Sequence, residues 1–317
     1  KKEEKEIMAT RHIILSVFIL FVFMGFSQTE EQRKYEPKKL QELKSFVINS
    51  KRTDSLSTYF HSKDVYSDIY LDSPDFILLR SGFSLRFRKR ISTDTPEITS
   101  YSFQLKSEMD SSNAIRMEVE ESELFFYKVK TNEHWVSLSS VLDSFFYCLE
   151  NNHDSNVAAK ILTSWVSFKA GSAIAPFQKL LFLKICDLNQ IRSLLPFTYG
   201  KSTRCRSHIY IDNQNVLLPS SLPNRVKADK LPFYFINNTN LIWVLESSLD
   251  YSMFYPLIPS QTPMIELVEY EVESKHSDIQ FSTSTLNMYE RALIHLFEVV
   301  PTKNSKYKQA MLSFLVL

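Results

Sequence analysis

The feature that most constrains this fold is a strict alternation of apolar and charged residues in several short segments. It occurs in residues 83 to 90 (FSLRFRKR), 103 to 107 (FQLKS), 115 to 122 (IRMEVEES) and 268 to 274 (VEYEVES). A period of two predicts β-strands, each with one apolar and one charged face. Taken alone, the pattern fits a sheet with one face on a core and the other in water.

Two further observations favour a different arrangement of the same strands. Residues 138 to 149, 156 to 169, 175 to 194 and 286 to 296 have apolar residues at helical spacing, so these helices need an apolar surface to cover. The basic and the mostly acidic faces also lie on separate strands. We therefore predict an α+β protein, an antiparallel β-barrel or tunnel with a charged lumen, flanked by helices.

The remaining elements complete this prediction. A helix is expected from Pro37 and a helical connection at 73 to 81. Further strands are expected at 65 to 72, 82 to 90, 99 to 107, 113 to 123, 202 to 212, 240 to 250 and 264 to 274.

Composition excludes several classes of protein. The chain has 317 residues, 44% of them hydrophobic, and a net charge of +1, so nothing indicates a nucleic-acid partner. Its three cysteines are widely spaced and predict neither a disulfide framework nor a zinc site. Only four glycines occur, and no P-loop, Rossmann, HExxH or GxSxG motif is present. Any phosphate would therefore have to be held by side chains.

The N-terminal residues 1 to 28 predict a signal peptide or an uncleaved anchor. Residues 13 to 26 (IILSVFILFVFMGF) form an apolar run that is short for a membrane span. We expect a secreted or periplasmic protein that contacts the membrane only through this segment if it is uncleaved. An outer-membrane β-barrel is a minor alternative, and the helical middle of the chain and the closing helix oppose it.

One longer stretch resembles a known family. Residues 70 to 90 (YLDSPDFILLRSGFSLRFRKR) are similar to the Y-x-D-T-P-D and L-R-x-R segment of CYTH domains, the triphosphate tunnel metalloenzymes. Similar motifs follow in family order: FQLKS, RMEVE (116 to 120), TRCR (203 to 206), LDYSMF (249 to 254), VEYEVES and SKY (305 to 307). The resemblance implies one tunnel domain at 29 to 317, with a longer helical insertion at about 131 to 195.

This resemblance implies metal-dependent hydrolysis of a bound triphosphate or polyphosphate, with Mg²⁺ or Mn²⁺ as cofactor. The basic residues implied to bind substrate are Lys34, Arg86, Arg88, Lys106, Arg116, Arg204, Arg206 and Lys306. The implied metal ligands are Glu30, Glu269 and Glu271, with Asp250 as an outer candidate, and Glu118 and Glu120 are implied to be catalytic. The chemistry suits these residue types, because arginine and lysine bind phosphate oxygens and hard divalent cations prefer carboxylates.

One position departs from the family pattern. The E-x-E-x-K signature is matched by EEQRK (30 to 34), which has Gln32 where the family has its second glutamate. Because an uncharged amide weakens a divalent site, a binding protein that has lost turnover is the alternative function. Among the other polar residues, Arg90 and Glu273 are expected to be solvated strand ends, Asp72 a turn or helix-start residue and His208 a structural histidine.

Overall fold

The computed structural model describes most of the chain after residue 27. The described residues are 28–49, 51–52, 56–93, 98–108, 115–122, 124, 127–130, 134–151, 153–212, 241–258, 260, 263–274, 279–302 and 304–315. The expected signal peptide or anchor therefore lies outside them, apart from residue 28. Within these ranges, no helix combines the length and the apolar character that crossing a membrane requires.

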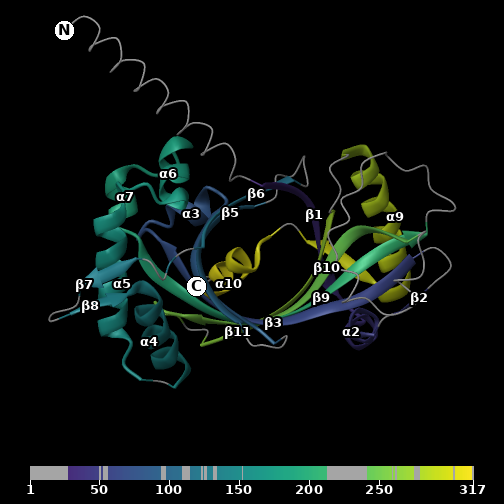
Figure 1. Cartoon of the computed structure of the whole chain (residues 1–317), viewed down its shortest axis with the longest axis horizontal. Helices are drawn as coiled ribbons and strands as arrows, with labels where there is room; N and C mark the ends of the chain where they lie inside the picture. Colours follow the sequence, from purple (N-terminus) through teal and green to yellow (C-terminus); the bar gives the residue numbers. More distant parts are fainter. Residues whose placement is uncertain are drawn as a thin grey trace, which may run out of the picture.

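A large antiparallel sheet forms the body of the protein (Figure 1). Its strands are β1 (Gln28–Pro37), β2 (Lys51–Arg52), β3 (Leu56–Asp72), β4 (Phe83–Ser92), β5 (Ile98–Ser107), β6 (Ile115–Glu121), β9 (Leu195–Asp212), β10 (Leu241–Pro256), β11 (Ile265–Ser274) and β12 (Val299–Thr302). The order is β11-β10-β9-β3-β4-β5-β6-β1-β12, with β2 beside β3 and a further pairing of β1 with β11. A separate hairpin pairs β7 (Lys128–Lys130) with β8 (Trp135–Ser137).

Helices flank this sheet in separate groups. They are α2 (Leu40–Ile48), α3 (Ile77–Arg80), α4 (Leu138–Glu150), α5 (Asn156–Lys169), α6 (Ala175–Phe182), α7 (Leu188–Arg192), α9 (Ile279–Phe297) and α10 (Lys306–Leu315). Helices α4 to α7 gather at one end of the sheet, and α2 and α9 at the other (Figure 1). The predicted α+β class with a large antiparallel sheet is confirmed, whereas closure of the sheet stays a prediction.

The apolar face of the sheet lies against the helices. Phe87 and Phe103 stack across β4 and β5 with ring centroids 4.4 Å apart, and Trp165 of α5 and Phe177 of α6 pack edge-on against Phe103. All four side chains are buried, and each full burial is worth about 1.5–3 kcal/mol. The odd-numbered residues of β4 and β5 therefore face the helices, and the intervening polar residues face the other side.

Helix α10 packs on the charged side of the sheet. Tyr307 stacks on Tyr70 of β3 with ring centroids 4.8 Å apart, and the same cluster contains Phe254 and Met311. The absence of a side chain at Gly200 of β9 leaves space for the Phe254 ring, since a Cβ at this position would lie 2.9 Å from the ring. The sequence pattern did not predict this last helix.

The helical region differs from prediction in one detail. The helix expected at 175 to 194 is two helices, α6 and α7. Lys184 between them has a left-handed φ of 55°, which ends the first helix. Asp187 then starts the second with a capping box, because it and Gln190 each bond the other's backbone N–H.

Candidate functional site

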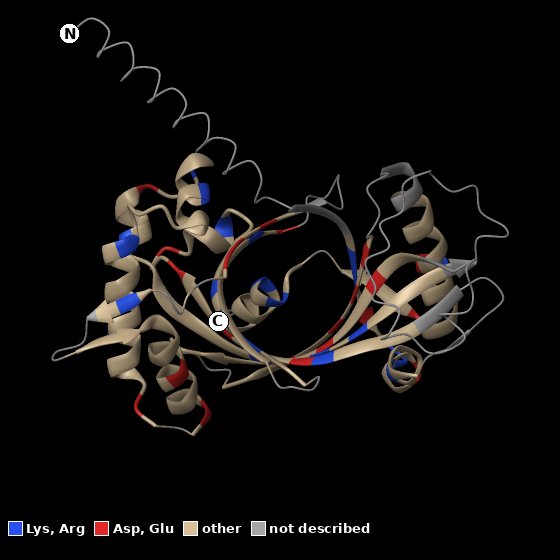
Figure 2. Cartoon of the chain, viewed as in Figure 1, with Lys and Arg blue, Asp and Glu red and all other residues tan. Residues whose placement is uncertain are grey.

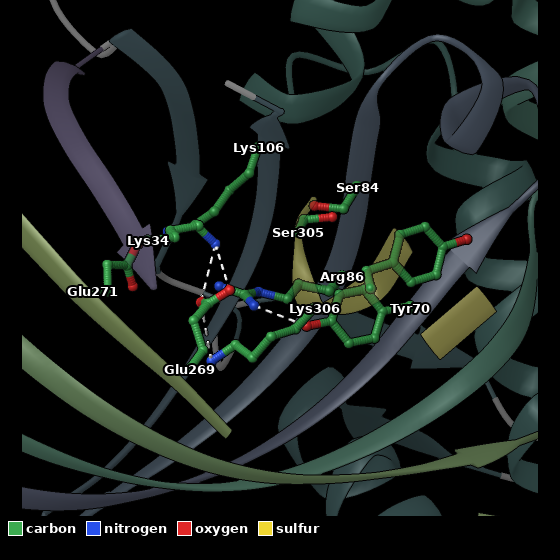
Figure 3. Close-up of a pocket in the computed structure, with 10 residues that line it drawn as sticks. Lys34, Tyr70, Ser84, Arg86, Lys106, Glu269, Glu271, Ser305 and Lys306 are labelled. Carbon is green, nitrogen blue, oxygen red and sulfur yellow. Dashed lines mark hydrogen bonds and ion pairs between the residues drawn. The ribbon is translucent and has the colours of Figure 1, made fainter. Parts of the chain in front are cut away.

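A pocket on the charged side of the sheet collects residues from distant parts of the chain (Figure 3). Five strands and the start of α10 contribute to it. Its lining consists of Lys34, Tyr70, Ser84, Arg86, Lys106, Glu269, Glu271, Ser305, Lys306 and Tyr307. Figure 2 shows basic and acidic positions following the curve of the sheet round α10. The pocket is therefore polar, with both signs of charge in its wall.

Three carboxylates meet at one side of this pocket. Asp250 of β10 lies directly opposite Glu269 of β11, and Glu271 is two residues further along the same face. All three are buried, and one carboxylate oxygen from each lies within 4.8 Å of the others. Oxygens bound to one octahedral ion at about 2.0–2.1 Å lie roughly 3 to 4 Å apart. Only small side-chain rotations separate this arrangement from a set of ligands for a hard divalent cation.

Two lysines are paired with the carboxylate cluster. Lys34 of β1 is buried, and its Nζ donates to the two Glu269 carboxylate oxygens at 3.0 and 3.2 Å. Lys306, at the start of α10, pairs with Asp250 and lies 3.9 Å from Glu269. The pairing of Lys34 also shows that EEQRK forms a strand here rather than an exposed tail.

Arg204 of β9 closes the same cluster from the other side. Its Nε and Nη2 donate to the two Asp250 oxygens at 2.8 and 2.6 Å, and Nη2 also donates to Glu271 at 3.2 Å. Burial alone raises the pKa of Asp250, but Arg204 and Lys306 outweigh burial and hold that pKa well below its usual range. The Asp250 carboxylate is therefore charged at neutral pH.

Arg86 is held by neighbours on two strands, β3 and β5. Its Nε and Nη2 donate to Gln104 Oε1 at 3.0 and 2.8 Å. Its Nη1 donates to Asp68 Oδ2 at 3.2 Å and to the Tyr70 hydroxyl at 3.0 Å. These contacts fix the guanidinium at the edge of the pocket.

Arg88, which does not line the pocket, is held by a fork of shorter hydrogen bonds. Its Nε and Nη2 donate to the two oxygens of buried Asp68, both at 2.7 Å, and its guanidinium lies 4.2 Å from the Tyr66 ring centroid. Burial raises the pKa of Asp68, but Arg86 and Arg88 reverse that effect and lower it.

Asp64 holds a second pair of arginines further along β3. Arg90 Nη2 donates to its two oxygens at 3.1 and 3.2 Å, and Arg206 Nη2 lies 3.6 Å from Oδ2. Asp64 is fully buried, whereas 39% of the Arg90 side chain is exposed. Arg90, expected to be a solvated strand end, is therefore both partly exposed and paired.

The structure places the remaining predicted residues as follows. Lys106 forms an ion pair with Glu118, its neighbour across β5 and β6. Glu120 lies opposite Gln104 and is exposed. Glu30 and Arg116 face each other in the β1–β6 register, and their side chains lie outside the described residues.

Gln32, at the departure from the family pattern, is buried on β1 opposite Glu273 of β11. Its Nε2 donates to Glu273 Oε1 at 2.6 Å. An amide therefore contacts the acidic strand at this position.

The sequence argument missed the acidic side of β3. Asp64, Tyr66, Asp68 and Tyr70 alternate along one face of this strand, with the same period of two that marked its neighbours. In the structure this strand pairs with RFRKR, and Asp68 lies directly opposite Arg88. The overlooked signal was thus the alternation of acidic and aromatic residues with their neighbours along residues 64 to 70.

Asp72 is confirmed as a helix-start residue. Its carboxylate accepts backbone N–H groups from Leu78 at 2.9 Å and Leu79 at 3.0 Å, and the hydroxyl of Tyr307 at 3.1 Å. Burial raises its pKa despite these hydrogen bonds.

Comparisons with known proteins add the following. No family model matches the sequence. No curated protein matches it either.

Solved structures do match along most of the chain. A protein of Pyrococcus horikoshii OT3 matches with 12% identity and a TM-score of 0.40, over 88% of this chain and 97% of its own. A candidate adenylate cyclase of Bacillus halodurans matches with 15% identity and a TM-score of 0.41, over 89% and 98%. A candidate adenylyl cyclase of Hippeastrum, described as having a dominant triphosphatase activity, matches with 10% identity and a TM-score of 0.40, over 90% and 94%.

These matches share only 10% to 15% sequence identity with this chain. Because their TM-scores are near 0.4, we base the functional argument on the geometry of the site and not on these matches.

Proposed function

We propose that this protein hydrolyses a triphosphate or polyphosphate with the help of a divalent metal ion, in a charged β tunnel of the CYTH type. The observation that carries the proposal is the pocket itself. Asp250, Glu269 and Glu271 converge there, buried, beside the cations Lys34 and Lys306. Carboxylates that can hold a cation, next to amines that can hold phosphate oxygens, are what phosphoryl transfer requires.

The tunnel is the second part of the proposal. Its support is the double pairing of β1, which bonds β6 through residues 28 to 31 and β11 through residues 32 to 35. With these two pairings, β1 links the first and the last strands of the β11-to-β6 order. A sheet linked in this way encloses its charged face, and the opposite charges across the lumen compensate one another.

The residues present suit a resident Mg²⁺ or Mn²⁺ ion. When bound, such an ion neutralises the charge that develops on the phosphoryl group and its leaving oxygen. Glu269 and Asp250 would then turn from the two lysines to the ion. Lys34 and Lys306 would be released to bind phosphate oxygens, and Arg86 would present a guanidinium from β4. Glu118, beside Lys106, is the carboxylate available to orient the attacking water.

A binding protein without turnover is the second candidate, and Gln32 is the observation that favours it. Its amide is buried against the acidic strand, where the family pattern has a carboxylate. Because an amide brings no negative charge, a divalent ion would be held less tightly there.

Phosphate release from tripolyphosphate, measured with and without Mg²⁺ or Mn²⁺, tests both candidates. The hydrolase predicts metal-dependent release that Glu269→Gln reduces by about two orders of magnitude or more, since a charged ligand is lost. Glu266→Gln is the matched control, because Glu266 lies on the same strand but is exposed. Tripolyphosphate binding without release would favour the binding protein, and absence of both binding and release would overturn both candidates.

We also propose that the protein acts outside the cytoplasm. The support is the apolar run at residues 13 to 26, which has the length of a signal-peptide core. Fractionation of cells that express the full chain tests this, and recovery of the uncleaved chain in the cytoplasm would contradict it.

A further inference from the structure

The charged face of the sheet has two zones that differ in what holds the basic residues. In the pocket, Lys34, Lys306 and Arg204 pair with Asp250, Glu269 and Glu271. Arg86, at the edge of the pocket, shares Asp68 with Arg88, and further along β3 and β4 Arg90 and Arg206 pair with Asp64. The difference matters because only the first set of carboxylates forms a cluster that can hold a metal ion among the described residues.

Asp68 occupies the hydrogen-bonding edge of Arg88. Two contacts of 2.7 Å join Nε and Nη2 to the two carboxylate oxygens, the fork geometry with which arginine binds carboxylate or phosphate. The Tyr66 ring covers one face of the same guanidinium. A phosphate could take this fork only by displacing Asp68, which would cost this buried carboxylate its two shortest hydrogen bonds and leave it the 3.2 Å contact with Arg86.

Asp64, about four residues or roughly 13 Å along the strand from Asp68, also pairs with arginines, but through their Nη2 atoms and without the fork. It is fully buried, receives Arg90 Nη2 at 3.1 and 3.2 Å and lies 3.6 Å from Arg206 Nη2. The Tyr66 hydroxyl adds a hydrogen bond at 3.2 Å. Removal of either arginine from this carboxylate is costly for the same reason as at Asp68.

We propose that Asp64 and Asp68 are specificity-determining residues that keep the arginines beyond the pocket occupied, so that the site accepts a short triphosphate group and gains no affinity from a longer polyphosphate chain. The inference rests on the proposed function. A metal ion would free cations only in the pocket, where its ligands are the partners of the lysines. The phosphates of a longer chain would meet Arg88 and Arg90 already paired.

The test is the chain-length dependence of binding. Apparent dissociation constants in Mg²⁺ would be measured for inorganic tripolyphosphate and for a long linear polyphosphate, expressed per triphosphate unit so that the many registers of the long chain do not by themselves raise its affinity. The wild-type protein is expected to bind both within about threefold. Asp64→Asn, which leaves the contacts of the pocket residue Arg86 intact, is expected to bind the long chain about tenfold more tightly, while tripolyphosphate affinity changes little, because the guanidinium groups of Arg90 and Arg206 become available.

Asp75→Asn is the matched control. Asp75 pairs with Arg80 on the exposed surface, so its substitution changes the net charge equally without freeing an arginine on the charged face. This variant should bind both ligands as the wild type does. The comparison of the two ligands on the wild-type protein needs no variant. It therefore tests the proposal even if a variant fails to fold.

The outcomes separate the inference from the function. Suppose the wild-type protein binds tripolyphosphate and its affinity already rises tenfold or more with chain length. That result would overturn the role of Asp64 and Asp68 but leave the proposed function standing. Folded variants that gain no affinity for the long chain would do the same. No tripolyphosphate binding by the wild type would overturn the proposed function together with the inference.

Discussion

At the scale of single residues, buried carboxylates decide both the local structure and the chemistry available. Asp72 uses its charge to start α3 and to hold Tyr307 of α10, whereas Asp250 lies in the ion-pair network of the pocket. The two have opposite pKa shifts because Asp72 has hydrogen bonds but no adjacent cation. A buried aspartate is therefore functional or structural according to its partners.

We predict that Asp72→Asn destabilises the protein by about 1–3 kcal/mol. The amide would replace one accepting oxygen by a donor that faces N–H or O–H groups. The measurement is the urea unfolding midpoint, with exposed Asp75→Asn as the control that leaves it unchanged. Equal midpoints for the two variants would show that the hydrogen bonds of Asp72 contribute nothing to stability.

At the scale of elements, the alternating pattern predicted which face of each strand is apolar, and the structure agrees for β4 and β5. The register between strands was not predictable from it, so Asp68 opposite Arg88 was missed. Helix α10 was missed as well, because Tyr307, Met311 and Phe314 are buried against strands that are distant in sequence. Periodicity gives the orientation of side chains within one element, whereas these contacts depend on how elements assemble.

We predict that the packing of α5 and α6 on the sheet contributes strongly to stability. Phe103→Ala removes a ring that contacts Phe87, Trp165 and Phe177, so it should cost about 3–5 kcal/mol. Phe168→Ala is the control at the surface of α5, where the side chain is 81% exposed, and should change stability by less than about 0.5 kcal/mol. Denaturant unfolding measures both, and a small effect at Phe103 would indicate that the helices are loosely packed.

At the scale of the whole molecule, ordered motifs predicted the general fold, and the roles of the individual charged residues stay predictions. In the structure, Lys34, Arg86, Glu269, Glu271 and Lys306, spread over more than 270 residues of sequence, line one pocket. The division into a pocket and a paired zone required the three-dimensional arrangement, because it depends on which carboxylate lies within reach of each arginine.

This charged interior makes stability depend on pH, in a direction that the pKa shifts decide. Asp68 and Asp250 have pKa values lowered in the folded protein by arginine and lysine neighbours that outweigh burial. The unfolded chain therefore binds protons before the folded protein does as the pH falls. Their stabilising contribution is present above the unfolded pKa, about 4, and is lost as the pH falls toward the lower folded values.

We predict that the free energy of unfolding is nearly constant from pH 7 to 5 and falls by about 1 kcal/mol for each such carboxylate by pH 3, about one pH unit below the unfolded pKa. Asp68→Asn should be less stable at pH 7 but lose less stability than the wild type on acidification, because one of the titrating groups is gone. The measurement is urea unfolding at fixed ionic strength between pH 7 and pH 3. Parallel pH profiles for the variant and the wild type would show that Asp68 does not contribute to this dependence.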